Sequence, residues 1–298
     1  MRVLITIGSG SLGVQLVKMM SEDPSNEIVA VETEDIEHQE FDRIGHNLVR
    51  QQCDLSDLAE LLRLSTNMDL IIHAAEFRSF AKRDKDRLFE INQQGTQHIV
   101  DCCVANGVNQ LLYVSDVAAL GADRGRLLNE DDIWMEKPLT SVFSQSKYLG
   151  EQEIWRGQAE GLSINIVAHS TVMSPSLLDK GYYPGGATGI VSEQDVVDIV
   201  KVLVNRGLDG EKYICSAHNM TYKEICEQHK NRGDLNIDLS PLRPWRAKLR
   251  SRFDMGGNHN VMDISDSESN LKYDNQKSIE QLQFNYRDVN QTFGHTAV

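Results

Sequence analysis

Cysteines are few in this chain and follow no recognisable spacing. There are five, two of them adjacent at Cys102 and Cys103, and no C-x-x-C pair or cysteine–histidine ligand spacing occurs. An odd number without such spacing argues against a disulfide framework and against a zinc site. We therefore expect reduced thiols in a cytoplasmic protein and no metal centre.

Long apolar runs and excess positive charge are also missing. No stretch approaches the roughly 18 apolar residues of a membrane-spanning helix, and the apolar N-terminal run reaches glycine too early for a signal peptide. The formal net charge is -14 and the pI about 5.1. Such a chain repels phosphate backbones and anionic lipids, so we expect no nucleic-acid or membrane partner. The one basic stretch, residues 243–252, is interpreted as a solvated helix face, with a docking patch for an acidic partner as the alternative.

Short apolar strands alternate with helical patterns over the first part of the chain. Unbroken apolar strands that alternate with helices are typical of a parallel sheet covered on both faces. The expected strands are 2–7, 27–32, 48–54, 69–75, 109–115 and 163–169, and the two long helices are 84–106 and 141–160.

This pattern predicts an α/β fold, a Rossmann-like doubly wound parallel sheet with a smaller C-terminal substrate lobe. We place the nucleotide-binding domain at 1–169 and the lobe at 170–298. The segment 191–216 is expected to return and pack on the sheet.

A glycine-rich turn follows the first strand and opens the first helix. Gly8, Gly10 and Gly13 have the G-x-G-x-x-G spacing of a dinucleotide-binding turn. Gly8 permits the tight turn, Gly10 admits a pyrophosphate to the backbone, and Gly13 lets the helix pack on the sheet. A purely structural glycine turn is the alternative.

An acidic residue, Glu32, ends the second strand, where a carboxylate hydrogen-bonds the ribose hydroxyls of a dinucleotide. The following residues, 33–42, add five acids and no basic residue before Arg43. A 2′-phosphate would therefore face negative charge, and NAD is predicted over NADP. The alternative is that Glu32 points to solvent.

Several ordered motifs resemble the extended short-chain dehydrogenase/reductase superfamily, in particular its NAD-dependent epimerase/dehydratase group and dihydroflavonol-reductase-like members. The motifs are "LITIGSGSLG", "CDLSD", "DLIIHAAE", "EINQQGTQHIV", "YVSDVAALG" and "FSQSK", and the likeness continues to about residue 287. The resemblance implies a cofactor site that also includes Ser11, Leu12, Asp54, Leu55, Ala74, Ala75, Asn92 and Lys147. It also implies a homodimer formed through the two long helices.

The chain departs from the family's pattern where the chemistry takes place. Phe143 stands in place of the catalytic tyrosine, four residues before the retained Lys147, and Asp116 replaces the catalytic serine. Asp116 is expected to form a structural ion pair with Lys147. Ala168 and His169 stand where the family has an Arg-Pro pair, and His169 is the alternative proton carrier. Tyr148 lies about 100° round the helix from Lys147 and should point elsewhere.

Two functions follow from the retained and the lost residues. The first is an NAD(P)-binding oxidoreductase or epimerase-like enzyme with an impaired or rerouted proton relay, in which Lys147, Asp116 and His169 are the catalytic candidates. The second is a non-catalytic NAD(H)-binding sensor or assembly partner. No motif identifies a substrate.

Overall fold

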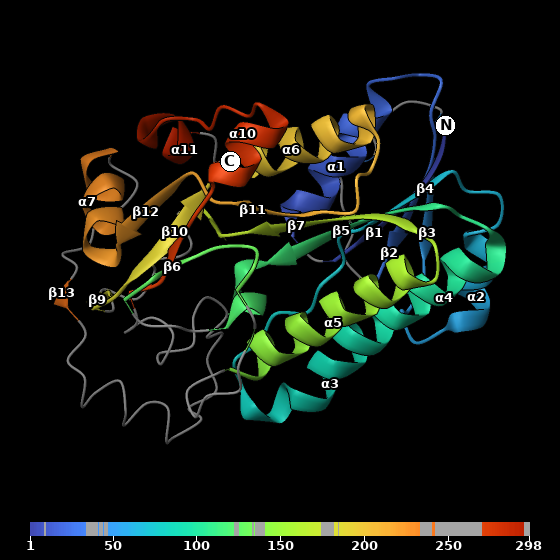
Figure 1. Cartoon of the computed structure of the whole chain (residues 1–298), viewed down its shortest axis with the longest axis horizontal. Coiled ribbons are helices and arrows are strands. Elements are labelled where there is room, and N and C mark those ends of the chain that lie inside the picture. The colour runs from blue at the N-terminus through green and yellow to red at the C-terminus, as the bar shows by residue number, and fades with distance from the viewer. Residues whose placement is uncertain are drawn as a thin grey trace.

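The computed structural model describes most of the chain, and its described part is a central sheet between two layers of helices with a smaller lobe (Figure 1). It describes residues 1–8, 10–33, 41, 44, 47–121, 125–132, 134, 141–173, 182–183, 185–232, 240–241 and 270–294. The basic segment 243–252 and most of the acidic segment 33–42 lie outside these residues.

The sheet has seven parallel strands in the order β11-β7-β5-β4-β1-β2-β3. Their bounds are β1 Arg2–Ile7, β2 Glu27–Glu32, β3 Leu48–Gln52, β4 Leu70–His73, β5 Gln110–Asp116, β7 Ser163–His169 and β11 Lys212–Cys215. The prediction of a doubly wound parallel sheet is confirmed, because the strand order runs outward in both directions from β1 and β4.

Helices cover both faces of the sheet because the strands are apolar on both sides. On one face lie α1 (Ser11–Ser21) and α6 (Glu193–Arg206), which pack against each other, and α10 (Gln276–Leu282). On the other lie α2 (Leu58–Leu64), α3 (Lys85–Phe89), α4 (Thr96–Asn106) and α5 (Val142–Ala159). A 3-10 turn (Lys82–Asp84) and a π-helical turn (Glu90–Gly95) complete the long helical segment predicted at 84–106. Two apolar cores, one on each face, hold these layers together.

The segment expected to return to the sheet supplies α6 and the edge strand β11. The lobe beside them has a three-stranded sheet of β8 (Thr171–Val172), β10 (Ala187–Val191) and β12 (His218–Thr221), with α7 (Tyr222–Arg232) and α11 (Val289–Gly294). The remaining elements are two short strand pairs, β6 (Leu127–Leu128) with β14 (Lys272–Tyr273) and β9 (Tyr182–Tyr183) with β13 (Ser240–Pro241), and a 3-10 turn (Val117–Leu120).

Candidate functional site

The carboxyl edge of the sheet brings most of the predicted site residues together. Gly8, Asp54 and Ala74 follow the ends of β1, β3 and β4, while Asp116 and His169 end β5 and β7. Ligands of open parallel sheets bind outside this edge, where the strand order reverses, here between β1 and β4.

The glycine turn combines a tight contact with an open position. A Cβ atom at Gly13 would lie 2.6 Å from Cγ2 of Ile7, so only glycine lets α1 approach β1 this closely. A Cβ atom at Gly10 would meet no atom within 4 Å. The backbone at Gly10, which precedes the first residue of α1, is therefore open to a ligand approaching the helix N-terminus.

Two predicted residues occupy the first turn of α1. The Ser11 hydroxyl donates a hydrogen bond to the carboxylate of Glu193, the first residue of α6. Leu12 is half-buried and packs against the apolar core. The first turn therefore carries one polar side chain, which is already bonded to a carboxylate at the anion-attracting end of the helix.

The negative charge of Glu32 is opposed by Arg50, which corrects the expectation of unopposed acidity there. Arg50 Nε lies 2.8 Å from Glu32 Oε1, and Nη2 lies 3.2 Å from Oε2. The adjacent strands β2 and β3 run in register, with Ala30 opposite Arg50 and Glu32 opposite Gln52. Charges counted along the chain missed this arginine because strand pairing brings it beside Glu32. The Glu32 side chain is only 9% exposed, so the alternative of a solvent-directed carboxylate is wrong.

The segment after β3 presents one exposed and one buried residue. Asp54 is exposed, and its Oδ1 accepts a hydrogen bond from Ser56 N at 2.8 Å. Leu55 is 1% exposed and lies against Gly95, and its carbonyl accepts from His98 Nδ1 at 2.7 Å. Asp54 is therefore free to meet a ligand at the surface, whereas the Leu55 side chain belongs to the core.

His73 ends β4 in a buried hydrogen-bonded position. Its Nδ1 lies 2.6 Å from Thr6 Oγ1, and its Nε2 lies 3.0 Å from Thr96 Oγ1. Complete burial, with a smaller contribution from the charge of Lys147, lowers the pKa of His73 to about 3. His73 is therefore neutral near pH 7. Of the two residues that follow it, Ala74 is half-buried and Ala75 fully buried.

Asn92 lies in the π-helical turn and joins three segments. Its Nδ2 donates to the Phe77 carbonyl at 2.8 Å and to Ser146 Oγ at 2.9 Å, and its Oδ1 accepts from Phe77 N at 2.8 Å. The amide thus ties the segment after β4 to α5. It orients the residues that face the sheet edge, and its own polar atoms are used by the protein.

Lys147 is completely buried, and its Nζ makes no hydrogen bond of good geometry within the described part of the chain. Its Nζ lies 3.2 Å from Glu76 Oε2 and 4.8 Å from the centre of the Tyr113 ring. Burial opposes the ammonium charge, but Tyr113 and Glu76 outweigh burial, and the pKa of Lys147 is raised. Lys147 is thereby kept as a charged ammonium that has N–H groups left for a ligand.

Asp116 does not pair with Lys147, so the predicted ion pair is wrong. Asp116 forms an ion pair with Arg78 Nη2, and its Oδ1 accepts from Ala118 N at 2.7 Å. The partner of Lys147 is Glu76, which also pairs with Arg78 at 3.3 Å. Burial favours the neutral form of Glu76, but Arg78 and Lys147 outweigh it and lower its pKa. The segment after β4 supplies both new partners, and nothing in the spacing of Asp116 and Lys147 reveals this.

The other residues around the missing relay have separate roles. The buried Ser115 hydroxyl donates to Glu151 Oε1 of α5 at 2.7 Å. Tyr148 stacks on Trp134 with ring centres 4.8 Å apart, so it points away from Lys147 as predicted. His169 Nδ1 lies 2.9 Å from the Ser170 carbonyl. Because a carbonyl only accepts, Nδ1 donates, and Nε2 is the unprotonated nitrogen of the neutral ring.

The model of the 3-beta hydroxysteroid dehydrogenase/isomerase family matches residues 4–167, which is more than half of the chain. The chain belongs to this family. The resemblance to extended short-chain dehydrogenase/reductases is confirmed at the level of the family and the fold.

Two relatives and two solved structures serve as examples of the proteins that resemble the chain. Sterol demethylase protein B of Methylococcus capsulatus is 23% identical over 76% of this chain and 73% of its own length. The 3 beta-hydroxysteroid dehydrogenase/Delta 5-->4-isomerase of Monkeypox virus is 26% identical over 51% of this chain and 45% of its own. Among solved structures, gox2253 aligns with a TM-score of 0.78 and 20% identity, covering 98% of this chain and 95% of that one. DesIV, a dTDP-glucose 4,6-dehydratase from Streptomyces venezuelae with NAD and TYD bound, aligns with a TM-score of 0.78 and 18% identity, covering 98% and 96%. At these identities the two structures show the fold alone.

Three charged residues of this family member were not singled out from the sequence. Glu76 and Arg78 follow β4, and Arg50 lies on β3. The pair after β4 carried a usable signal, because polar residues directly beyond a buried parallel strand lie at the ligand-binding edge. Arg50 carried none, since only the register of β2 and β3 places it beside Glu32.

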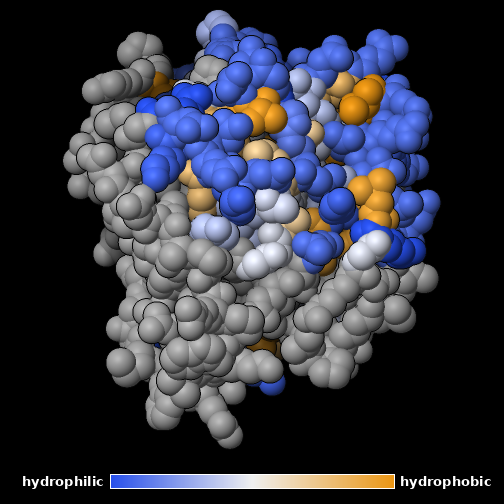
Figure 2. Space-filling model, turned by 90° about the vertical axis from the view of Figure 1, so that its left-hand side faces the viewer, coloured by the Kyte–Doolittle hydropathy of each residue, from blue (hydrophilic) through white to orange (hydrophobic). Residues whose placement is uncertain are grey.

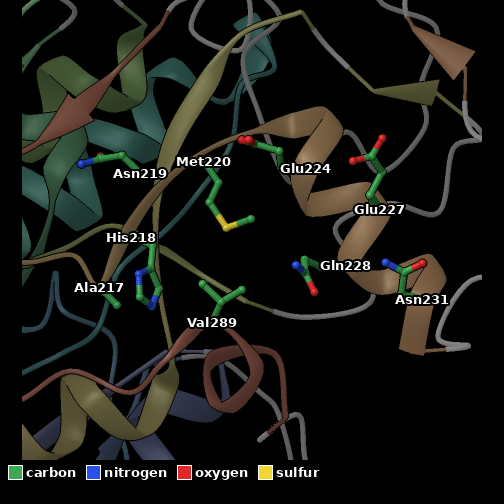
Figure 3. Close-up of a pocket in the computed structure, with 9 residues that line it drawn as sticks. All are labelled: Ala217, His218, Asn219, Met220, Glu224, Glu227, Gln228, Asn231 and Val289. Atoms are coloured by element: carbon green, nitrogen blue, oxygen red, sulfur yellow. The ribbon is translucent and has the colours of Figure 1, made fainter.

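Apart from the sheet edge, a hollow of about 570 Å³ opens on the lobe of this family member. Figure 3 shows that α7, β12 and the start of α11 line it. Its lining residues are Ala217, His218, Asn219, Met220, Glu224, Glu227, Gln228, Asn231 and Val289. None of them is a predicted site residue. The described surface on the side that Figure 2 faces is mainly hydrophilic, with apolar residues in small separate groups.

Two absences apply to the described part of the chain. It contains no group of three or more histidine, cysteine, aspartate or glutamate side chains that could hold a metal ion. None of its helices has both the length and the apolar character needed to cross a membrane.

Proposed function

We propose that this chain is an NAD-dependent oxidoreductase of its family that interconverts an alcohol and a carbonyl group without a tyrosine relay. The observation that carries the proposal is the buried ammonium of Lys147, which pairs with Glu76 at 3.2 Å but makes no hydrogen bond of good geometry within the described part of the chain. An unsatisfied buried donor of this kind costs about 1–3 kcal/mol or more. The ribose hydroxyls of a bound dinucleotide would supply the missing acceptors.

The residues present fit a dinucleotide from end to end. Gly10 leaves the N-terminus of α1 open to a pyrophosphate, Gly8 lets β1 run close to the Glu76 backbone, and Asp54 offers an exposed carboxylate to the adenine. Lys147 would hold the nicotinamide ribose. When bound, the nicotinamide supplies or accepts the hydride.

The preference for NAD over NADP rests on Glu32. Its carboxylate ends β2 and is held by two hydrogen bonds from Arg50, so it is oriented to accept from ribose hydroxyls. A 2′-phosphate would have to displace that carboxylate from Arg50. NAD is the cofactor that leaves the pair intact.

The proton path of the proposed reaction avoids position 143. Phe143 has no ionisable group, and Asp116 is bonded to Arg78 and to a backbone N–H. His169 has an unprotonated Nε2 at the carboxyl edge, beside the end of β5. We assign the proton to His169 or to water that reaches this edge.

The relatives support hydride chemistry on an alcohol or ketone. The Monkeypox virus protein is named as a hydroxysteroid dehydrogenase and isomerase, and the Methylococcus capsulatus protein as sterol demethylase protein B. The structure of DesIV contains NAD. A non-catalytic sensor finds no comparable support among these proteins.

Titration of NADH and NADPH by fluorescence tests the proposal. The protein is expected to bind NADH more tightly than NADPH. Lys147→Met is expected to weaken NADH binding about tenfold or more, the effect of losing a charged hydrogen-bond donor. Lys201→Met is the matched control, because Lys201 on α6 is exposed and pairs with Glu22 instead. Absence of NADH binding, or equal affinity in the parent and Lys147→Met, would refute the assignment.

A further inference from the structure

Arg78 joins the two positions at which the family's hydroxyl groups are lost. Its Nη2 pairs with the carboxylate of Asp116, which replaces the serine. Its guanidinium carbon lies 4.7 Å from the centre of the Phe143 ring, which replaces the tyrosine. The two substitutions therefore contact one side chain, and a cation–π contact of this kind needs only the aromatic face, which Phe143 keeps.

One nitrogen of the Arg78 guanidinium, Nη1, makes no hydrogen bond with the described residues. Its Nε and Nη2 are used by Glu76 and Asp116. Its Nη1 donates to no atom of the described part of the chain, and the side chain is 31% exposed. Arginine carries five N–H groups in a fixed plane, so the two on Nη1 remain for a ligand.

The surrounding charges select the kind of ligand. Glu76 and Asp116 are negative, Arg78 and Lys147 are positive, and their formal charges cancel. A carboxylate or phosphate ligand would meet two fixed carboxylates together with the two cations and would gain little net attraction. A neutral oxygen that becomes negative during reaction gains from a donor that is held in place beforehand.

We propose that Arg78 Nη1 binds the reacting oxygen of a neutral ketone, aldehyde or secondary alcohol, in place of the lost serine and tyrosine hydroxyls. Asp116 and Phe143 position the guanidinium, one by the ion pair and the other by its ring face. This inference rests on the proposed function, since it assigns the substrate-binding residue of the same site.

The step balances without proton loss from Arg78. In the reducing direction a nicotinamide held in the dinucleotide site would supply the hydride to the carbonyl carbon, and the π electron pair of the C=O bond would move to oxygen. That oxygen, held by Arg78, takes a proton from water or from protonated His169. The guanidinium stays charged throughout, because its pKa is raised by the Asp116 and Glu76 carboxylates against the opposing effect of burial.

The test follows NADH consumption with benzaldehyde and cyclohexanone, and with pyruvate as an anionic carbonyl. The parent is expected to favour the neutral probes. Arg78→Ala is expected to lower kcat/KM for them about 10²-fold, the effect of removing one oxyanion donor, while NADH affinity changes less than about threefold. Added guanidinium ion should restore part of the activity of Arg78→Ala, which a merely structural loss would not allow.

The test includes one control variant and one substitute for Arg78→Ala. Arg87→Met is the matched control, because Arg87 lies 4.3 Å from the Phe77 ring on the neighbouring segment and outside the charge cluster. If Arg78→Ala unfolds, Arg78→Ala with Asp116→Asn removes the buried unpaired carboxylate and is measured instead.

The outcomes separate this inference from the proposed function. Failure of the parent to bind NADH refutes the proposed function itself. Normal NADH binding with no turnover of the neutral probes overturns the role of Arg78, and so does preference for pyruvate. Activity in the Arg78 variant within about threefold of the parent also overturns it.

Discussion

Glu32→Gln is expected to shift cofactor preference towards NADPH. In the parent the carboxylate neutralises Arg50, with Arg50 Nε 2.8 Å from Glu32 Oε1 and side chains 33% and 9% exposed. The glutamine removes the negative charge and releases Arg50 to pair with a 2′-phosphate. One substitution therefore replaces a repulsion with an attraction.

The magnitude follows from the Coulomb energy at this degree of burial. Two unit charges about 4 Å apart interact by about 1 kcal/mol in water and about 4 kcal/mol at the effective dielectric of a protein surface. The pair is partly buried, so the effect should lie between these limits. Since 1.4 kcal/mol is tenfold in affinity, the ratio of NADPH to NADH affinity should rise at least about fivefold.

Fluorescence titration of both reduced cofactors at low and high salt measures this change. Glu27→Gln is the matched control, because Glu27 begins the same strand and pairs with Arg2 at 3.3 Å, away from the sheet's carboxyl edge. Arg50→Met combined with Glu32→Gln should cancel the gain. An unchanged affinity ratio in Glu32→Gln, or the same gain in Glu27→Gln, would refute the ribose assignment and the role of Arg50.

Three further outcomes are expected. Gly10→Leu should abolish NADH binding in the fluorescence titration without lowering the urea midpoint, and retained binding would make the turn structural only. Gly13→Ala should instead cost roughly 1–3 kcal/mol of stability, because the added methyl group overpacks the contact with Ile7. Because the folded-state pKa of His73 is about 3, below its unfolded value of 6.5, its stabilising effect is complete above pH 6.5 and is lost as the pH falls. The unfolding free energy should therefore drop by about 1.4 kcal/mol from pH 7.5 to 5.5, and His73→Gln, measured in the same urea series, should remove most of that slope. Glu151→Met and Lys212→Met each break the buried ion pair between these residues, whose atoms lie 2.6 Å apart, and each should lower the unfolding free energy by roughly 3–5 kcal/mol. The double variant should lose less than the sum of the two, and strictly additive losses in urea melts would refute the pair.

Local spacing was enough to predict the fold, and it also predicts the nucleotide end of the site, which stays a prediction. Apolar strands that alternate with helices predict the layers, because each element's period depends only on its own residues. The turn from Gly8 to Gly13 and the helix that carries Phe143 and Lys147 are read from contiguous residues in the same way. The helix forms at Val142–Ala159, within the range expected for it.

Only the tertiary structure decided how the charges are paired. The sequence shows that Asp116 and Lys147 are unusual neighbours of one site, and the simplest pairing joins them to each other. In the fold, the segment after β4 inserts Glu76 and Arg78 between them, so that each has a separate partner. Ion pairs depend on distances of a few ångströms between side chains remote in sequence, and those distances are set by strand register and helix packing, which no local pattern encodes.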